Sequence, residues 1–157
     1  MVRLSMFRVL VILSVAAPAV PASAQTGAAQ RLAHVNSVAC TFRAVAKGDW
    51  NKQTGEPQGE VSRSDFSVAF EQINADEGTA VAVGRFGPSD IIVRFAVSTL
   101  HLVQSFNEGP LYVTSIFSDE TRDRHFKAVH TRHEFTTVSL PGFTSRPEQY
   151  YGTCEIK

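Results

Sequence analysis

Hydrophobic and polar residues alternate along most of the chain beyond residue 35, with the period of two that is typical of half-buried β-strands. In the first such segment, Val38, Cys40, Phe42 and Ala44 share one face. Helical periodicity is scarce. The pattern predicts about eight strands, over residues 38–45, 65–73, 79–86, 90–97, 99–106, 111–117, 125–135 and 149–156.

Turn-forming residues separate most of these segments. Glycine, proline, asparagine and aspartate supply the backbone angles that tight turns need, and they occur at residues 76–78, 87–90 and 107–110. Residues 47–60 and 139–149 are predicted to be longer loops. Short strands joined by turns predict an all-β fold, an antiparallel meander of about eight strands that forms a closed or partly open barrel. A two-sheet β-sandwich is the alternative.

The two cysteines lie near the two ends of this pattern. Cys40 falls on the first predicted strand and Cys154 on the last. Neither belongs to a C-x-x-C motif, and an even pair in an oxidising compartment is most simply a disulfide. A Cys40–Cys154 bond would bring the first and last strands together. Closure of a barrel requires the same proximity, although a sandwich can also place its terminal strands side by side.

The first 24 residues have the features of a secretory signal peptide. Arg3 and Arg8 precede a short apolar run, and residues 22–24 form an A-x-A cleavage signal. The apolar run is shorter than the roughly 20 residues that cross a bilayer. We therefore predict a signal peptide over residues 1–24, a flexible N-terminal tail or the start of a short helix over 25–34, and a single β-domain over 35–157, in a secreted or periplasmic protein.

The charge of the mature chain limits the kinds of partner that we expect. Removal of the signal peptide leaves 13 basic and 15 acidic residues. Nucleic-acid-binding proteins usually carry a marked basic excess, so no nucleic-acid partner is expected. No basic amphipathic helix indicates a membrane surface, and we expect no membrane span in the mature chain. We expect a soluble monomer that binds no cofactor.

The segment His125–Phe135 holds the densest group of candidate functional residues. On a helix, His130 and His133 would share a face and could hold a metal, but β-branched and aromatic neighbours favour a strand. On a strand they point to opposite faces, which disfavours a metal site. The inward polar pair is either His130 with Arg132 or His133 with Thr131, and a β-bulge inside the segment would reconcile its conflicting apolar positions.

The single tryptophan, Trp50, heads a predicted polar loop and is a second candidate for contact with a ligand. The tripeptide Gly48-Asp49-Trp50 resembles the G-x-W of lipocalins. This resemblance covers three residues and implies a similar barrel architecture, not a function. In lipocalins the tryptophan lies within the first strand, whereas here it follows the predicted strand that carries Cys40.

No catalytic motif is present. The chain contains neither a G-x-S-x-G nucleophile elbow nor a phosphate-binding G-x-x-x-x-G-K-[ST] loop. We therefore predict an exported, non-enzymatic β-domain that binds a small ligand or a protein partner through His130, Arg132, His133 and Trp50. The alternatives are an enzyme that uses His130, Arg132 and His133, and a structural envelope-associated protein without a small ligand.

Overall fold

The computed structural model describes residues 26–84, 87–107, 109–135 and 145–157. The predicted signal peptide, residues 1–24, lies outside them. The described elements are α1 (Thr26–Ala33), β1 (Val38–Trp50), β2 (Pro57–Asn74), β3 (Thr79–Gly84), β4 (Gly87–Ala96), β5 (Thr99–Ser105), β6 (Leu111–Glu120), β7 (Phe126–His133) and β8 (Glu148–Ile156).

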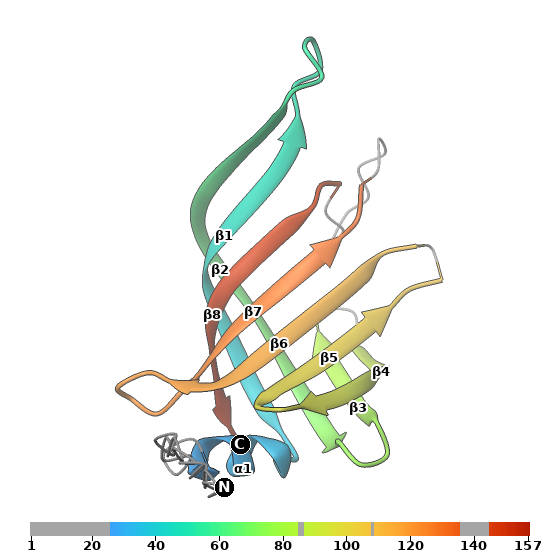
Figure 1. The fold of residues 1–157 in the computed structure, drawn as a ribbon. Coiled ribbons are helices and arrows are strands. Elements are labelled where there is room, and N and C mark those ends of the chain that lie inside the picture. The colour runs from blue at the N-terminus through green and yellow to red at the C-terminus, as the bar shows by residue number, and fades with distance from the viewer. Residues whose placement is uncertain (1–25, 85–86, 108, 136–144) are drawn as a thin grey trace, which may run out of the picture.

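The strands form one antiparallel sheet in chain order, and β8 pairs with β1 to close the sheet into a ring (Figure 1). The predicted all-β antiparallel meander is therefore confirmed, in its barrel form. The barrel is uneven because β2 has 18 residues whereas β3 has 6. We call the end beside α1 the base and the opposite end, where the turn between β1 and β2 projects, the mouth.

The mouth contains a strand pair where a loop was expected. Residues 47–50 of β1 pair with residues 57–60 of β2, so most of the predicted 47–60 loop is a continued hairpin. Its turn is closed by Asn51, whose side-chain oxygen accepts hydrogen bonds from the backbone N–H groups of Gln53 and Thr54 at 2.9 and 3.0 Å. Of the predicted 139–149 loop, residues 139–144 lie outside the described part of the chain.

A change of register in β1 alters which side chains face inward. The pairing of β1 with both neighbours shifts between Phe42 and Ala44. As a result Val45 is buried, whereas Ala44, which was expected to continue the inward face, is only partly buried. A Cβ atom added at Gly152 of β8 would lie 2.6 Å from the Cα atom of Phe42. Only glycine fits at this close approach of β8 to β1 without movement of the backbone.

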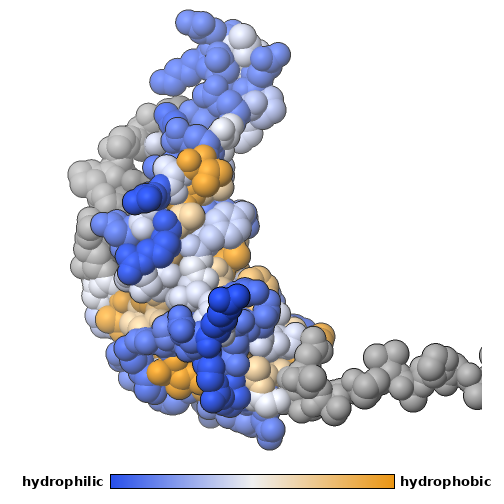
Figure 2. Space-filling model, turned by 90° about the vertical axis from the view of Figure 1, so that its left-hand side faces the viewer, coloured by the Kyte–Doolittle hydropathy of each residue, from blue (hydrophilic) through white to orange (hydrophobic). Residues whose placement is uncertain are grey.

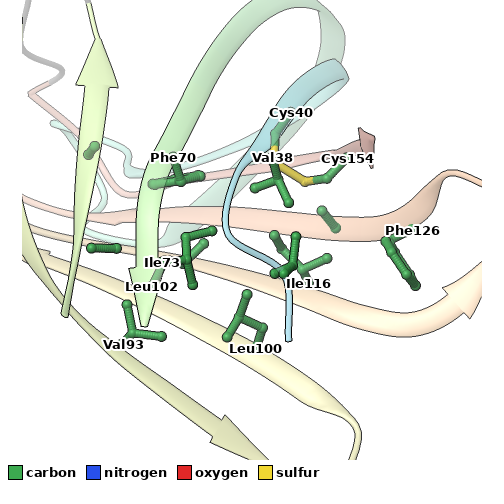
Figure 3. Packing of buried hydrophobic residues seen from close by; sticks show 14 of the residues in the cluster. Val38, Cys40, Phe70, Ile73, Val93, Leu100, Leu102, Ile116, Phe126 and Cys154 are labelled. Carbon is green, nitrogen blue, oxygen red and sulfur yellow. A yellow bond between two sulfur atoms is a disulfide. The ribbon is translucent and has the colours of Figure 1, made fainter. Parts of the chain in front are cut away.

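The base holds the apolar core (Figure 3). Residues 25–34 were expected to form a flexible tail or the start of a short helix, and the structure has the helix: α1 packs across the base and buries Leu32 completely. Arg31 of the same helix forms an ion pair with Glu120 of β6. An apolar side chain that fills the open end of a ring removes more surface from water than a solvated tail could. Core residues of the strands include Val38, Phe70, Ile73, Val93, Leu100, Leu102, Ile116 and Phe126.

The predicted disulfide is confirmed. Cys40 and Cys154 are directly opposed residues of β1 and β8, with Cα atoms 4.0 Å apart. Both are buried, and they are separated by 114 positions in the sequence. The bond therefore fastens the seam at which the first and last strands meet. No helix among the described residues is long and apolar enough to cross a bilayer.

Candidate functional site

Inward-facing side chains change character along each strand between the base and the mouth. On β7, Phe126 and Ala128 are followed by His130 and Arg132. On β6, β8 and β5 the corresponding series run from Ile116 to Thr114 and Tyr112, from Cys154 to Tyr150 and Glu148, and from Leu100 and Leu102 to Gln104. The same alternation that fills the base therefore supplies a polar and aromatic lining nearer the mouth.

A cavity of about 740 Å³ occupies this upper part of the ring. Of the described residues, β3 pairs with β2 only between Ala69 and Asn74, so the rest of β2 has β1 as its partner strand and the wall opens beside it. Apolar side chains form one part of the lining, and they include Val45, Val68, Phe70, Ala82 and Leu102. Small-molecule sites typically measure about 300–1,000 Å³, and this cavity falls in that range.

His130 is buried in the cavity wall and hydrogen-bonded through both ring nitrogens. Its Nδ1 atom lies 2.8 Å from Oγ1 of Thr114, and its Nε2 atom accepts a hydrogen bond from Nε of Arg132 at 3.4 Å. Because Nε2 accepts, Nδ1 carries the proton and donates it to Thr114. Burial, together with the nearby Arg132 charge, lowers the pKa of His130 to about 3. The imidazole is therefore neutral at physiological pH.

Arg132 lies among aromatic rings. Its guanidinium carbon is 4.6 Å from the ring centroid of Phe66, 4.9 Å from that of Tyr150 and 5.2 Å from that of Tyr112. These distances fit cation–π contacts. Only 15% of the Arg132 side chain is exposed, and its Nη1 atom lies 3.9 Å from a carboxylate oxygen of Glu148. The rings hold the guanidinium in place at the wall of the cavity.

Glu148 lies beside this group and is itself buried. It accepts a hydrogen bond from the hydroxyl of Tyr150, and its other oxygen lies 3.8 Å from Nζ of Lys47. Burial, and then the hydrogen bond to Glu148, raises the pKa of Tyr150 well above its ordinary value. Burial, and then the charge of Glu134, raises the pKa of Tyr112 to about 12. Both phenols therefore keep their protons near neutral pH.

The structure brings together two of the four predicted site residues. His130 and Arg132 both line the cavity, which resolves the alternative left open for their strand. His133 is exposed on the outer side, and Trp50, 47% exposed, packs edge-on against Phe135 with ring centroids 5.2 Å apart. Neither lines the cavity. His133 and Trp50 point to the outer faces of their strands, whereas His130 and Arg132 point inward.

A β-bulge inside residues 125–135 would have reconciled the apolar positions of that segment, but the irregularity lies elsewhere. The pairing of β7 with β8 is regular from Phe126 to Arg132. The shift in register falls in β6 instead, between Ile116 and Glu120. Phe126, Ala128 and His130 share one inward face because β7 alternates regularly.

Sequence reasoning did not select Tyr112, Thr114, Lys47 or Glu148 for the site. Their signal is positional: Tyr112 and Thr114 are two residues apart, as are His130 and Arg132 on the neighbouring strand, and the register pairs Tyr112 with Arg132 and Thr114 with His130. That signal requires knowledge of which strands are neighbours.

Among the described residues, no three histidine, cysteine, aspartate or glutamate side chains gather as a metal ion would require. The cavity is lined by side chains of the ring. Comparisons of the chain with protein-family models, with curated proteins and with solved structures found no significant match.

Proposed function

We propose that this protein is an exported β-domain that binds a small organic ligand in the cavity of its ring and does not transform it. The observation that carries the proposal is the cavity of about 740 Å³, in which an apolar region and a few convergent polar groups face the same space. That combination is typical of binding sites for small molecules.

The ionisable groups of the cavity support binding more than acid–base chemistry. A general base or acid is most effective when its pKa lies near the working pH. The pKa of His130 is lowered to about 3, and that of Tyr112 is raised to about 12. Both nitrogens of His130 are also engaged by protein groups. These side chains present fixed polarity to a ligand rather than a mobile proton.

Export is supported by the disulfide between Cys40 and Cys154 and by the features of residues 1–24. Disulfides persist in oxidising compartments such as the periplasm and the extracellular space. A ligand-binding role in such a compartment is therefore part of the proposal.

The test is a fluorescence titration with N-phenyl-1-naphthylamine, a neutral probe that brightens in apolar surroundings. We expect saturable binding, and we expect Ala82→Phe to abolish it because the larger side chain would occupy part of the cavity that Ala82 lines. Val83→Phe is the matched control, since Val83 is the next residue of β3 and does not line the cavity.

Circular dichroism melting would show whether each variant folds. Absence of saturable binding to the wild-type protein would refute the proposal, and so would equal binding by a folded Ala82→Phe variant.

A further inference from the structure

From the position of Arg132 in the cavity wall, we infer that the ligand carries one anionic group, a carboxylate or a sulfonate, which pairs with Arg132 while an apolar body extends toward Phe70 and Leu102. This inference rests on the proposed function and names the chemical class of its ligand.

Arg132 is only loosely paired with the acidic side chains around it. Lys47 and Arg132 both approach the single carboxylate of Glu148, at 3.8 and 3.9 Å. Both distances exceed the length of a hydrogen bond, so neither cation is tightly paired. A second carboxylate, that of Glu134, accepts a hydrogen bond from the Tyr112 hydroxyl at 3.2 Å. Since its contact with Glu148 is longer than a hydrogen bond, Arg132 can still bind the anionic group of a ligand.

Arg132 retains hydrogen-bonding capacity toward the cavity. A guanidinium has five N–H donors, and the hydrogen bond to His130 uses the one on Nε. Within the described residues, no side-chain nitrogen or oxygen is both buried and without a hydrogen-bond partner. The terminal nitrogens of Arg132 that lack a partner must therefore reach the solvent of the cavity, which Arg132 lines.

The surroundings of Arg132 fix its direction before any ligand arrives. Phe66, Tyr112 and Tyr150 contact the guanidinium, and His130 holds its Nε atom. A guanidinium held in this way can grip an anionic group through two parallel hydrogen bonds at little entropic cost. Because His130 stays neutral over the physiological range, Arg132 is the cation of this pair.

The opposite part of the lining suits an apolar body. Phe70, Ala82 and Leu102, from β2, β3 and β5, are buried apolar residues of the cavity lining. Burial of apolar ligand surface there contributes roughly 25 cal/mol for each Å² removed from water. The anionic group and the apolar body therefore have separate places in one cavity.

The test compares two probes that share a skeleton. 8-Anilinonaphthalene-1-sulfonate is N-phenyl-1-naphthylamine with an added sulfonate, so the difference between their affinities reports the anionic group. We expect the sulfonate probe to bind at least tenfold more tightly to the wild-type protein. Arg132→Gln should weaken the sulfonate probe about tenfold to hundredfold and the neutral probe less than about threefold.

Two further variants keep the test decisive if Arg132→Gln folds poorly. Arg132→Lys keeps the charge but loses the paired donors, so we expect an intermediate loss for the sulfonate probe. Arg94→Gln is the matched control, because Arg94 is exposed on the outer face of β4 and should change neither affinity.

The outcomes separate the two proposals. If the neutral probe binds but the sulfonate gains nothing, or if Arg132→Gln weakens both probes equally, the anionic class is wrong and the binding function stands. If the neutral probe does not bind to the wild-type protein, the binding function itself is refuted.

Discussion

The same strands build the base and the mouth of the ring, but the side chains that point inward differ between the two ends. On β7, Phe126 and Ala128 pack in the base, whereas His130 and Arg132, further along the same face, line a cavity. Figure 2 shows hydrophilic side chains over the projecting end of the β1–β2 hairpin and a mixture of hydrophobic and hydrophilic side chains below it.

This difference indicates a division of work along each strand. The base has the disulfide, helix α1 and a continuous apolar cluster, and these supply most of the stability. The mouth has polar side chains around an open space, which leaves room for a ligand. Substitutions in the base should therefore affect unfolding first, and substitutions at the mouth should affect binding first.

Loss of the disulfide should have the largest effect. In the chain-entropy model a bond that closes a loop of about 100 residues stabilises the folded state by about 4.7 kcal/mol. We expect the double variant Cys40→Ala/Cys154→Ala to lose an amount of that order in urea unfolding. A reductant should reproduce the loss in the wild-type protein and leave the variant unchanged; an unaltered midpoint would contradict the role of the seam.

Truncation of Leu32 tests whether α1 belongs to the base. Leu32 is fully buried, and Leu→Ala substitutions at such sites cost about 2–5 kcal/mol. We expect Leu32→Ala to lower the free energy of unfolding by about 3 kcal/mol. Gln30→Ala, at an exposed position of the same helix, is the control. Equal stability of the two variants would mean that the helix is not part of the core.

Gly152→Ala tests the close approach of β8 to β1 between the base and the mouth. The added methyl group would overlap with the backbone of Thr41 and Phe42. Overpacking of this kind costs about 1–3 kcal/mol, and we expect the upper end because backbone atoms yield less than side chains. Gly84→Ala is the matched control, since a Cβ there meets no atom within 4 Å. Chemical denaturation of both would show the difference.

His130 should make stability depend on pH. Its pKa is about 3 in the folded protein and near the ordinary value of 6.5 in the unfolded chain. The unfolded state therefore binds the proton first as pH falls, so stability is full above about pH 6.5 and declines toward pH 3. From pH 7 to pH 5 we expect a loss of about 2 kcal/mol through this group.

The variant His130→Gln should remove that part of the slope, as measured by urea unfolding at several pH values. His133→Gln should keep it, because His133 is exposed. Parallel pH profiles for wild type and His130→Gln would contradict the assignment of a buried neutral imidazole.

The smallest effect is expected outside the cavity. Surface substitutions usually change stability by less than about 0.5 kcal/mol. We expect His133→Ala to stay within that limit and to bind N-phenyl-1-naphthylamine as the wild type does. A clear loss of probe binding would return His133 to the candidate site and weaken the contrast between the two faces of β7.

The sequence predicted the strands well because their inward faces repeat every second residue, and Cys40 and Cys154 identified the seam. It could not choose between the two faces of β7, since Phe126 and Ala128 favour one face and Val129 the other. The choice depends on how β7 pairs with β6 and β8, which no pattern within β7 reveals.

Other differences have similar causes. The hairpin at residues 47–60 resembled a loop because strands exposed on both faces have no need of alternation. The shift after Phe42 moved Val45 inward, and a strict period of two cannot express a change of register. Helix α1 has too few residues for its periodicity to stand out, and its stability comes from packing against the base.

The pairing of β1 with β8 has a consequence for the order in which the chain can fold. β1 has one partner nearby in the sequence, β2, and another that is complete only when residues 148–156 exist. A nascent chain that emerges N-terminus first must hold one edge of β1 unpaired throughout its synthesis. Sheets with such distant pairings fold on the slow side, in about milliseconds to seconds. A truncation that removes β8 would therefore affect more than the C-terminus. It would leave β1 and β7 each with one edge whose backbone groups have no partner strand.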